Sequence, residues 1–401
     1  MVLVISDSKM KAGDNGEYFY EYVMNNHNDE LYFIISNKSS DYDRLINKGF
    51  NVVDVNDMRM DDIFEKADYI LYSKEQYPLS QPRCRKYVNK RVFLQHGVTT
   101  KMSLSPQSWD KHNRFSKFIC SASEGEKALL ENYLGVNMST PVVTGFARWD
   151  SLRRKNDERE KHSAPHILIT FHWRAGKMNH DLNTFLKSEY LENVNALLNS
   201  DELKELSSKC EITFMHHAQF AKYKNYFKVP PYIKYGTNLQ FQDMLVDADL
   251  LITDISSNAY EMAVIGKPTF YYIPDMEYVK KNMTNYKIGN LKKNSIGKYC
   301  DDFNELILSI NQFVNGEFEL SEANKKNIID TLGEMDSNNC SRIYYMLFDN
   351  LNNPNNGKSE NKQSEHIVHT GGIWNKAMKM KAMVDEGSKK RIKVGDKFIF
   401  V

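Results

Sequence analysis

Short apolar runs alternate with amphipathic stretches along the first 150 residues. Helical periodicity, with apolar side chains on one face, lies at 17–26, 41–48 and 124–134. Apolar runs of strand length lie at 2–6, 31–36, 52–55, 69–73, 92–94, 118–121 and 142–145. Strands separated by helices pair in parallel, so this pattern predicts an open α/β sheet.

The same alternation returns after residue 165. Strands are predicted at 167–170, 212–214, 250–253 and 269–272, with helices at 182–198, 241–246 and 258–265. Two consecutive α/β domains of similar size predict two Rossmann-like halves that face a cleft. Ligands of open α/β sheets bind outside the carboxyl ends of the strands, so we expect the chemistry in the crevice between the halves.

Polar segments set the predicted domain boundaries. Residues 151–164 are highly charged and lack an apolar period, which predicts a surface linker between domains at 1–150 and 165–350. Residues 352–365 cannot bury a core, so 351–401 is predicted as a linker and basic tail. The part of the tail around Trp374 is either an amphipathic appendage that contacts lipid or a frayed end.

The amino-acid composition restricts the classes of binding partner that we expect. The 53 basic and 52 acidic side chains give a formal net charge of +1, whereas proteins that bind nucleic acid usually carry a basic excess. We therefore expect no nucleic-acid partner. The five cysteines form no CxxC pair, which argues against a zinc knuckle or disulfide framework and favours a reducing cytoplasm.

The sequence shows neither a recognisable signal peptide nor an apolar stretch of membrane-spanning length. We expect a cytoplasmic protein whose basic tail makes any peripheral contact with the inner face of the membrane. The first predicted strand begins at residue 2, which suggests a chain cut from a longer one, with a natural start as the alternative.

A buried strand, a polar turn and a helix follow one another at 248–263. Asp254, Ser256 and Ser257 fall at the turn, where a helix N-terminus offers free N–H groups and partial positive charge. Serine hydroxyls add donors to phosphate oxygens, so the turn is a candidate phosphate site. Ordinary helix capping is the alternative, since Asp and Ser are favoured N-caps.

A His-Gly pair ends a strand on the cleft side of the first predicted domain. The imidazole of His96 could act as a base toward a hydroxyl nucleophile, and Gly97 allows close approach of a ligand to the backbone. A hydrogen-bonded structural histidine is the alternative.

Two arginines are candidates for anion binding. Arg148 could meet an anion in the cleft or pair with Asp150, and Arg174 could clamp a phosphate through its bidentate fork. His216 and His217 end another strand, but adjacent side chains of an extended chain point in opposite directions. One of them could face the cleft, and we expect no metal site.

The loop 11–17 is rich in glycine and joins the first strand to the first helix, but it is neither GxGxxG nor a Walker loop. Asp14 and Asn15 in this loop could contact the acceptor. A plain turn with Asx capping is the alternative.

Taken in this order, the motifs resemble the CDP-glycerol glycerophosphotransferase family, whose members polymerise teichoic acids and whose related domains occur in capsule polymerases. The resemblance covers roughly residues 1–345. Its segments are the run 248–257 with Gly-Lys-Pro at 266–268, the His-Gly pair, the segment 144–150, Trp173-Arg174 and the loop 14–16.

The resemblance implies a GT-B fold with the donor bound in the second domain and the acceptor in the first. It implies that His96 is the catalytic base and that His217 corresponds to the histidine of a His-Pro motif. It also implies that the turn with Asp254, Ser256 and Ser257 binds phosphate. Glu261 stands where the family commonly has Asp.

Several positions depart from the family pattern and put the donor in doubt. Ala218 replaces the proline after His217, and Ala147 replaces the proline of the Gly-x-Pro-Arg segment. Phe171 and His172 stand where Pro and Thr usually precede Trp-Arg.

The implied reaction moves glycerol phosphate from CDP-glycerol to the terminal hydroxyl of a teichoic-acid-like or capsule polymer, or of a lipid-linked acceptor, and releases CMP. No cofactor is required. CDP-ribitol or a nucleotide sugar is the alternative donor on the same fold. A non-catalytic polymer-binding module of a larger synthase is the alternative from another class.

Overall fold

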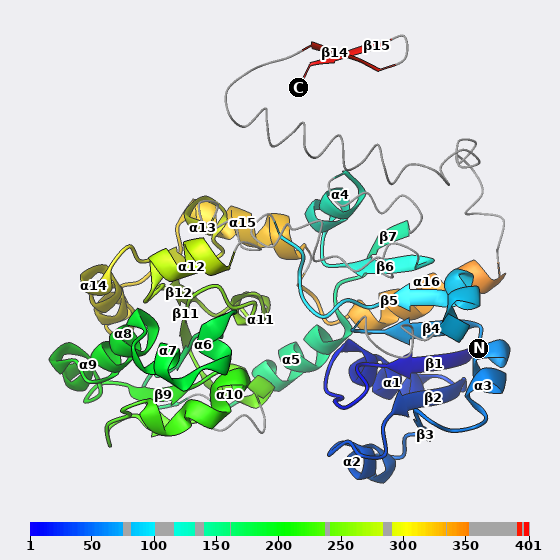
Figure 1. Cartoon of the computed structure of the whole chain (residues 1–401), viewed down its shortest axis with the longest axis horizontal. Helices are drawn as coiled ribbons and strands as arrows, with labels where there is room; N and C mark the ends of the chain where they lie inside the picture. The colour runs from blue at the N-terminus through cyan, green and yellow to red at the C-terminus, as the bar shows by residue number, and fades with distance from the viewer. Residues whose placement is uncertain are drawn as a thin grey trace. The chain divides into compact units, whose positions relative to one another are not determined.

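The computed structural model describes residues 1–74, 82–100, 116–132, 140–160, 162–236, 241–283, 291–333, 335–352, 391–394 and 397–400. The chain divides into two compact units, Met1–Phe348 and Asp349–Val401. The first unit holds two parallel sheets, which confirms the predicted α/β fold class (Figure 1).

The first sheet has seven parallel strands in the order β3-β2-β1-β4-β5-β6-β7. Because helices cover both faces, its strands are almost continuously apolar. Their bounds are β1 Val2–Ser6, β2 Glu30–Ile35, β3 Val52–Asp54, β4 Tyr69–Tyr72, β5 Arg91–Phe93, β6 Phe118–Ser121 and β7 Thr140–Val143. The helices up to β7 are α1 Asn15–Asn26, α2 Tyr42–Asn47, α3 Met60–Lys66, η1 Pro82–Lys90 and α4 Glu124–Asn132.

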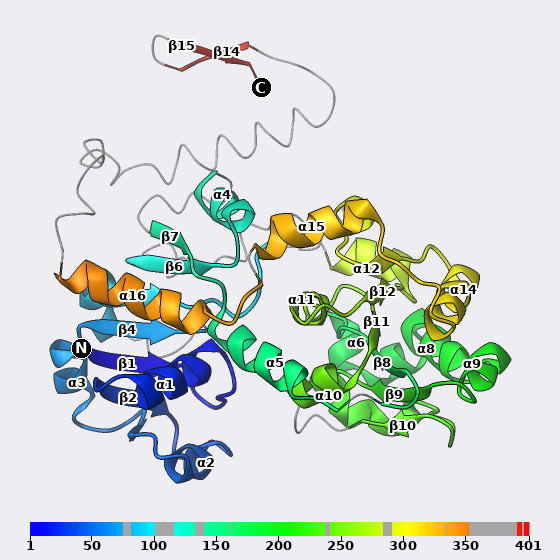
Figure 2. The same ribbon diagram turned by 180° about the vertical axis from the view of Figure 1, so that it is seen from behind.

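Alternate residues of the first sheet face two different cores. Leu3 and Ile5 of β1 pack in one cluster with α1 and with α16 (Asn339–Asn352), whereas Val4 packs in another cluster with α3. Figure 2 shows α16 lying along this sheet. The last helix of the range that we predicted as the second domain therefore completes the core of the first sheet.

The second sheet has six parallel strands in the order β10-β9-β8-β11-β12-β13. The strands are β8 His166–Thr170, β9 Glu211–Met215, β10 Lys234–Tyr235, β11 Leu250–Thr253, β12 Thr269–Tyr271 and β13 Lys298–Tyr299. The accompanying helices are α6 Lys177–His180, α7 Leu182–Leu186, α8 Glu189–Leu198, α9 Asp201–Leu206, η3 Ala218–Tyr226, α10 Phe241–Asp247, α11 Asn258–Val264, α12 Met276–Asn282, α13 Leu291–Asn294, α14 Phe303–Val314 and α15 Glu322–Leu332.

Two local predictions differ from the structure. The helix predicted at 182–198 is two helices, α7 and α8, because the Ser188 hydroxyl caps the second by accepting the Leu191 N–H at 3.2 Å. The start of the predicted linker 151–164 is helical, since α5 runs over Ala147–Asp157. Trp149 and Leu152 lie on one buried face of α5. Because Trp149 precedes the charged run, residues 151–164 taken alone show no apolar period.

Only a hairpin is described in the second unit beyond α16. Strand β14 (Arg391–Val394) pairs antiparallel with β15 (Lys397–Phe400). The predicted linker from 353 onwards and the tail around Trp374 lie outside the described residues. In the part of the chain that is described, every helix is too short or too polar to cross a membrane.

Candidate functional site

A buried carboxylate organises the carboxyl edge of the first sheet. Asp7 follows β1 and accepts the backbone N–H groups of Asp14 at 2.9 Å and Gly16 at 2.7 Å, together with the Ser73 hydroxyl at 2.6 Å. Burial, with the nearby charge of Asp14, raises the pKa of Asp7 to about 7. A Cβ on Gly16 would lie 2.6 Å from the Asp7 carboxylate, so this position requires glycine. Asp7 fixes the loop that carries Asp14, and an acidic residue directly after a strand was the signal that could have identified it.

The imidazole of His96 is paired with a carboxylate of that loop. His96 Nδ1 contacts Asp14 Oδ2, and Arg148 Nη1 donates to Asp14 Oδ1 at 3.1 Å. Burial by itself would raise the pKa of Asp14, but the His96 hydrogen bond and the charges of His96, Arg148 and Lys74 lower it. An ionised Asp14 accepts Nδ1–H, which leaves the lone pair on Nε2 of a ring that is 63% exposed. This is the arrangement of an oriented general base.

The residue before His96 is held in a strained conformation. Gln95 has φ +60°, and it is the one non-glycine residue with positive φ in the described part of the chain. Its buried amide donates to the Cys120 carbonyl at 2.6 Å, and its own carbonyl accepts from Asn15 Nδ2 at 2.8 Å. These contacts fix the turn from which His96 leaves the sheet, and strain of this kind is typical of functional sites.

Asn15 supports this turn and is not exposed to an acceptor. The side chain is 0% exposed, and its Oδ1 also accepts the Arg148 backbone N–H at 3.1 Å. The predicted acceptor contact is therefore unsupported for Asn15, because both ends of the amide are used within the protein. Gly97 is free of such constraints, since an added Cβ would meet no atom within 4 Å. Close approach of a ligand there stays a prediction.

Arg148 connects the edge of the first sheet to a helix of the second. Besides Asp14, its guanidinium binds Glu261 of α11, with Nε 3.2 Å from Oε1 and Nη2 in contact with the same oxygen. The alternative pairing with Asp150 is not formed, because Asp150 accepts the backbone N–H groups of Asn339 and Cys340. Glu261 is buried in this ion pair. Its carboxylate bridges to Arg148, and the predicted contact with the donor substrate is unsupported in this geometry.

Residues from three separate motifs lie together at the carboxyl edge of the second sheet. His172 follows β8, His217 follows β9, and Asp254 follows β11. Asp254 is 0% exposed, and its Oδ1 accepts the His172 backbone N–H at 2.8 Å. Because parallel strands share this edge, separate motifs meet there.

Arg174 is buried beneath this edge. Its Nη1 donates to Asp254 Oδ2 at 2.6 Å, and its Nε donates to Asp275 Oδ2 at 2.8 Å. The side chain is 0% exposed, and although burial opposes its charge, the two carboxylates raise its pKa further. The predicted phosphate clamp is therefore unsupported in this geometry. Arg174 instead positions Asp254 and, through it, the backbone of His172. Asp275, the second partner of Arg174, was not singled out by the sequence.

His217 has a different hydrogen-bonding environment from His96. Its Nδ1 accepts the Gln219 backbone N–H at 3.2 Å, and its ring centroid lies 5.4 Å from that of His172. Burial, together with repulsion from His172, lowers the pKa of His217 to about 4. The ring is neutral near pH 7 and, with Nδ1 occupied as an acceptor, its proton lies on Nε2. His217 is consequently a hydrogen-bond donor at neutral pH.

The two serines of the turn behave differently. Ser256 is buried, and its hydroxyl accepts the Asn258 N–H at 3.3 Å. Ser257 is exposed at the N-cap position of α11, yet its side chain makes no capping hydrogen bond. A turn hydrogen bond thus explains the geometry of Ser256, whereas the Ser257 hydroxyl has no capping function.

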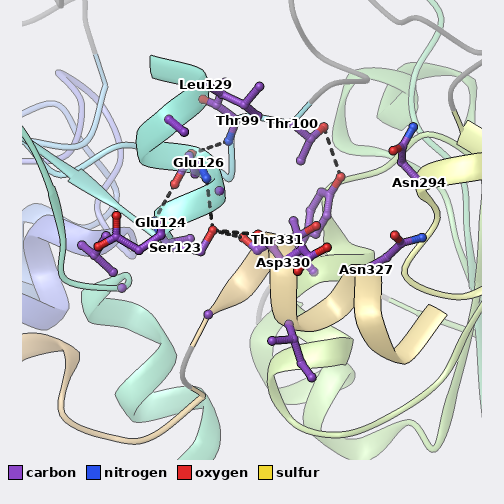
Figure 3. Close-up of a pocket in the computed structure, with 18 of the residues that line it drawn as sticks. Thr99, Thr100, Ser123, Glu124, Glu126, Leu129, Asn294, Asn327, Asp330 and Thr331 are labelled. Atoms are coloured by element: carbon purple, nitrogen blue, oxygen red, sulfur yellow. Dashed lines mark hydrogen bonds between the residues drawn. The ribbon is translucent and has the colours of Figure 1, made fainter. Parts of the chain in front are cut away.

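A cavity of about 800 Å³ opens beside the His96 turn (Figure 3). Thr99 and Thr100 line one side and Asn294 and Asn327 another, while Glu126 accepts the Thr99 N–H at 2.5 Å. Burial raises the pKa of Glu126 to about 7. None of the predicted site residues is among the described residues that line this cavity.

Comparison with known proteins confirms the resemblance seen in the motifs. The family model described as CDP-Glycerol:Poly(glycerophosphate) glycerophosphotransferase matches residues 1–349. The minor teichoic acid biosynthesis protein GgaB of Bacillus subtilis (strain 168) is 25% identical over 373 residues, which cover 88% of this chain and 40% of GgaB. The chain thus spans about two fifths of the length of that relative.

Solved structures share the fold. The wall teichoic acid polymerase TagF matches with a TM-score of 0.62 and 14% identity, over 88% of this chain and 89% of the other. A TagF variant soaked with CDPG matches with a TM-score of 0.63 and 15% identity, over 88% and 90%. The UDP-GlcNAc 2-epimerase from Neisseria meningitidis bound to UDP-GlcNAc matches with a TM-score of 0.55 and 14% identity, over 87% and 99%.

Proposed function

We propose the function of this chain from its family, because the chain belongs to the CDP-glycerol:poly(glycerophosphate) glycerophosphotransferase family. The chain transfers glycerol phosphate from CDP-glycerol to the terminal hydroxyl of a growing teichoic-acid-like or capsule polymer and releases CMP. The observation that carries this proposal is the His96–Asp14 pair, in which an ionised carboxylate turns the lone pair of an exposed imidazole outward.

The same proposal includes a GT-B arrangement in which the carboxyl edges of the two sheets face one cleft. Two observations support it. Arg148 joins Asp14 at the edge of the first sheet to Glu261 of α11. The cavity beside the His96 turn is lined by Thr99 and Thr100, which follow β5 of the first sheet, and by Tyr260 of α11. The CDPG soak of the TagF variant supports a CDP-polyol donor.

In the reaction, His96 Nε2 takes the proton of the acceptor's terminal hydroxyl. The oxygen attacks the β-phosphorus of CDP-glycerol, a new P–O bond forms, and the P–O bond to CMP breaks. Asp14 holds the ring through Nδ1–H and stabilises the imidazolium that results. The proton on His96 is then available to the leaving phosphate or to solvent.

The donor phosphates are held by neutral hydrogen-bond donors on the second sheet. His217 offers Nε2–H, and the exposed Ser257 hydroxyl lies at the start of α11. Positioned donors of this kind stabilise charge as it develops on the transferred group. Arg174 acts indirectly, because its ion pairs with Asp254 and Asp275 hold the backbone that carries His172.

The reaction takes place in the cytoplasm and uses no bound cofactor. Any membrane contact would come from the basic tail, and the acceptor is a polyol-phosphate polymer or a lipid-linked primer. The activity assigned here is that of the 401-residue chain, which matches only part of GgaB.

The test is a donor panel with product identification. The full chain is incubated with a glycerol phosphate oligomer and CDP-glycerol, CDP-ribitol or a UDP-sugar, and the released nucleotide is identified by mass spectrometry. CMP release that depends on CDP-glycerol and extends the acceptor supports the proposal. CMP from CDP-ribitol alone, or CDP or UDP from a sugar donor, would transfer the assignment to the alternative donors. Donor binding without turnover would favour a non-catalytic module of a larger synthase.

A further inference from the structure

A second cluster of polar side chains lies at the opposite edge of the second sheet from the catalytic residues. His166 begins β8, His162 precedes it in the connector, and Asp247 ends α10. His162 Nε2 lies 2.7 Å from Asp247 Oδ1, and His166 Nδ1 lies 2.9 Å from Asp247 Oδ2. One ligand atom from each residue lies within 4.8 Å of the others. His172 and Asp254 lie past the carboxyl ends of β8 and β11, so the cluster is separate from the proposed active site.

The hydrogen bonds around His166 favour a metal ligand. The His166 ring is buried. Its Nε2 lies 2.8 Å from the Thr213 hydroxyl. Without a metal, Nδ1–H can donate to Asp247, whose Oδ2 lies at 2.9 Å and whose backbone carbonyl lies at 3.3 Å. When Nε2–H donates to the Thr213 hydroxyl instead, the Nδ1 lone pair is available to a cation held with the Asp247 carboxylate. An outer hydrogen bond of this kind is typical of metal-bound histidines.

The surroundings leave a route to this cluster. His162 is exposed and forms the solvent side, while His166 forms the buried side. Arg159 Nη2 donates to the Asp247 backbone carbonyl at 2.7 Å, and its Nη1 binds Asp249 at 2.8 Å. Arg159 therefore binds the Asp247 backbone carbonyl and the Asp249 carboxylate, and the Asp247 carboxylate contacts the two histidines.

We propose that His162, His166 and Asp247 bind one divalent transition-metal ion of the zinc class, with a fourth position open to water. Two imidazole nitrogens and one carboxylate oxygen suit zinc better than magnesium or calcium, which take oxygen ligands. Zinc bonds of roughly 2.0–2.2 Å require the facing atoms to separate by about 0.5 Å from their present hydrogen-bonded distances.

Such an ion would fasten the connector after α5 to α10 and β8. It would act on stability rather than on phosphoryl transfer, since binding to the folded state alone stabilises that state. This inference does not depend on the proposed function, and neither its success nor its failure changes the assignment of His96.

The experiment uses the full chain without a histidine tag, stripped with a chelator and then titrated with Zn²⁺ against a competing indicator. Co²⁺ is added in parallel, because tetrahedral Co²⁺ shows strong visible absorption. Wild type is expected to bind one ion per chain, to show the tetrahedral spectrum and to melt at a higher temperature with Zn²⁺. His162→Ala and Asp247→Asn should lose all three effects, and Thr213→Val should weaken binding by roughly 10–100-fold.

Two histidine variants serve as controls. His180 is exposed on α6 and outside the cluster, so His180→Ala should bind like wild type. His217→Ala removes a ring of the other histidine pair and should also keep the bound ion. Equal binding by wild type and His162→Ala, or loss of the ion in His217→Ala alone, would overturn the proposal. Circular dichroism of each variant separates loss of a ligand from loss of the fold.

Discussion

His96 belongs to the first sheet and His217 to the second, and the structure gives the two rings opposite chemistry. Each follows the carboxyl end of a parallel strand, β5 for one and β9 for the other. His96 Nδ1 meets the Asp14 carboxylate, whereas His217 Nδ1 accepts the Gln219 backbone N–H. The first contact leaves a lone pair on Nε2 and the second leaves a proton there. The partner of one ring nitrogen thus decides whether the other nitrogen is a base or a donor.

The supporting residues differ in the same way. The His96 side is built from Asp7, Asp14 and Arg148, so charged groups surround a ring that remains exposed. The His217 side is built over a fully buried arginine with two carboxylates, and the ring above it is neutral. A proton acceptor benefits from a nearby carboxylate, whereas burial and repulsion from His172 keep the His217 ring neutral as a hydrogen-bond donor.

The largest expected effect comes from removing the proposed base. His96→Ala should lower CMP release by roughly 10²–10⁴-fold, the usual loss for a general base. Donor affinity, measured by calorimetry, should stay near that of wild type because the donor contacts belong to the second sheet. His180→Ala is the matched control. Near-normal turnover per folded molecule, or a fall in melting temperature that accounts for the loss, would remove His96 from the mechanism.

A smaller effect is expected at His217. His217→Ala should lower turnover by about 10²–10³-fold, as for the loss of one donor to a developing oxyanion. Glutamine keeps an N–H donor but cannot act as a base, so His217→Gln should recover part of the activity, while His96→Gln should recover none. This pair of glutamine variants tests the comparison directly. Equal behaviour of the two variants would show that the histidines share one role.

The serine turn should affect binding more than turnover. Ser256→Ala with Ser257→Ala should weaken CDP-glycerol binding by roughly 1.5–3 kcal/mol per lost hydrogen bond to a charged phosphate. Ser207→Ala with Ser208→Ala, which changes two neighbouring serines at the end of α9, is the control. Calorimetry with CDP-glycerol measures the difference, and unchanged affinity in the turn variant would contradict the assignment.

The smallest effect concerns stability against pH. The folded pKa of His217 is about 4, below the usual unfolded value of roughly 6.5, so the unfolded chain takes up a proton first as pH falls. The contribution of His217 to stability is present above pH 6.5 and is lost as pH decreases toward 4. Denaturant titrations between these values should show a shallower loss of stability in His217→Gln than in wild type. Identical pH dependence would mean that the ring is charged in the folded state or has the same pKa in both states.

Much of the site could be predicted because local sequence determines where strands end. Apolar runs bounded by turn residues predicted most of the central strands, and parallel pairing brings the carboxyl ends of such strands to one edge. For that reason His96 and Asp14 could be assigned to one sheet, and His217 and Asp254 to the other, before their contacts were known. The glycine at position 16 was visible as part of a turn, although its contact with Asp7 was not.

Other features depended on partners that lie far away in the chain. Arg148 and Glu261 are 113 residues apart, and Arg174 and Asp275 are 101 apart. A motif identifies an arginine but does not reveal whether its fork faces a ligand or two buried carboxylates. The side chains of Arg174, Asn15 and Glu261 are used in contacts within the protein, so the ligand contacts predicted for them are unsupported in this geometry.

The sequence by itself determined the two parallel sheets, most of their strands and the edges at which polar residues collect, because these follow from local periodicity and from the geometry of parallel pairing. Only the tertiary structure decided that α16 packs on the first sheet, that Gln95 adopts a left-handed backbone, and which atom each histidine presents. These depend on burial and on the partner of each polar atom. Both are set by residues packed together in space, often more than 20 positions apart in the chain.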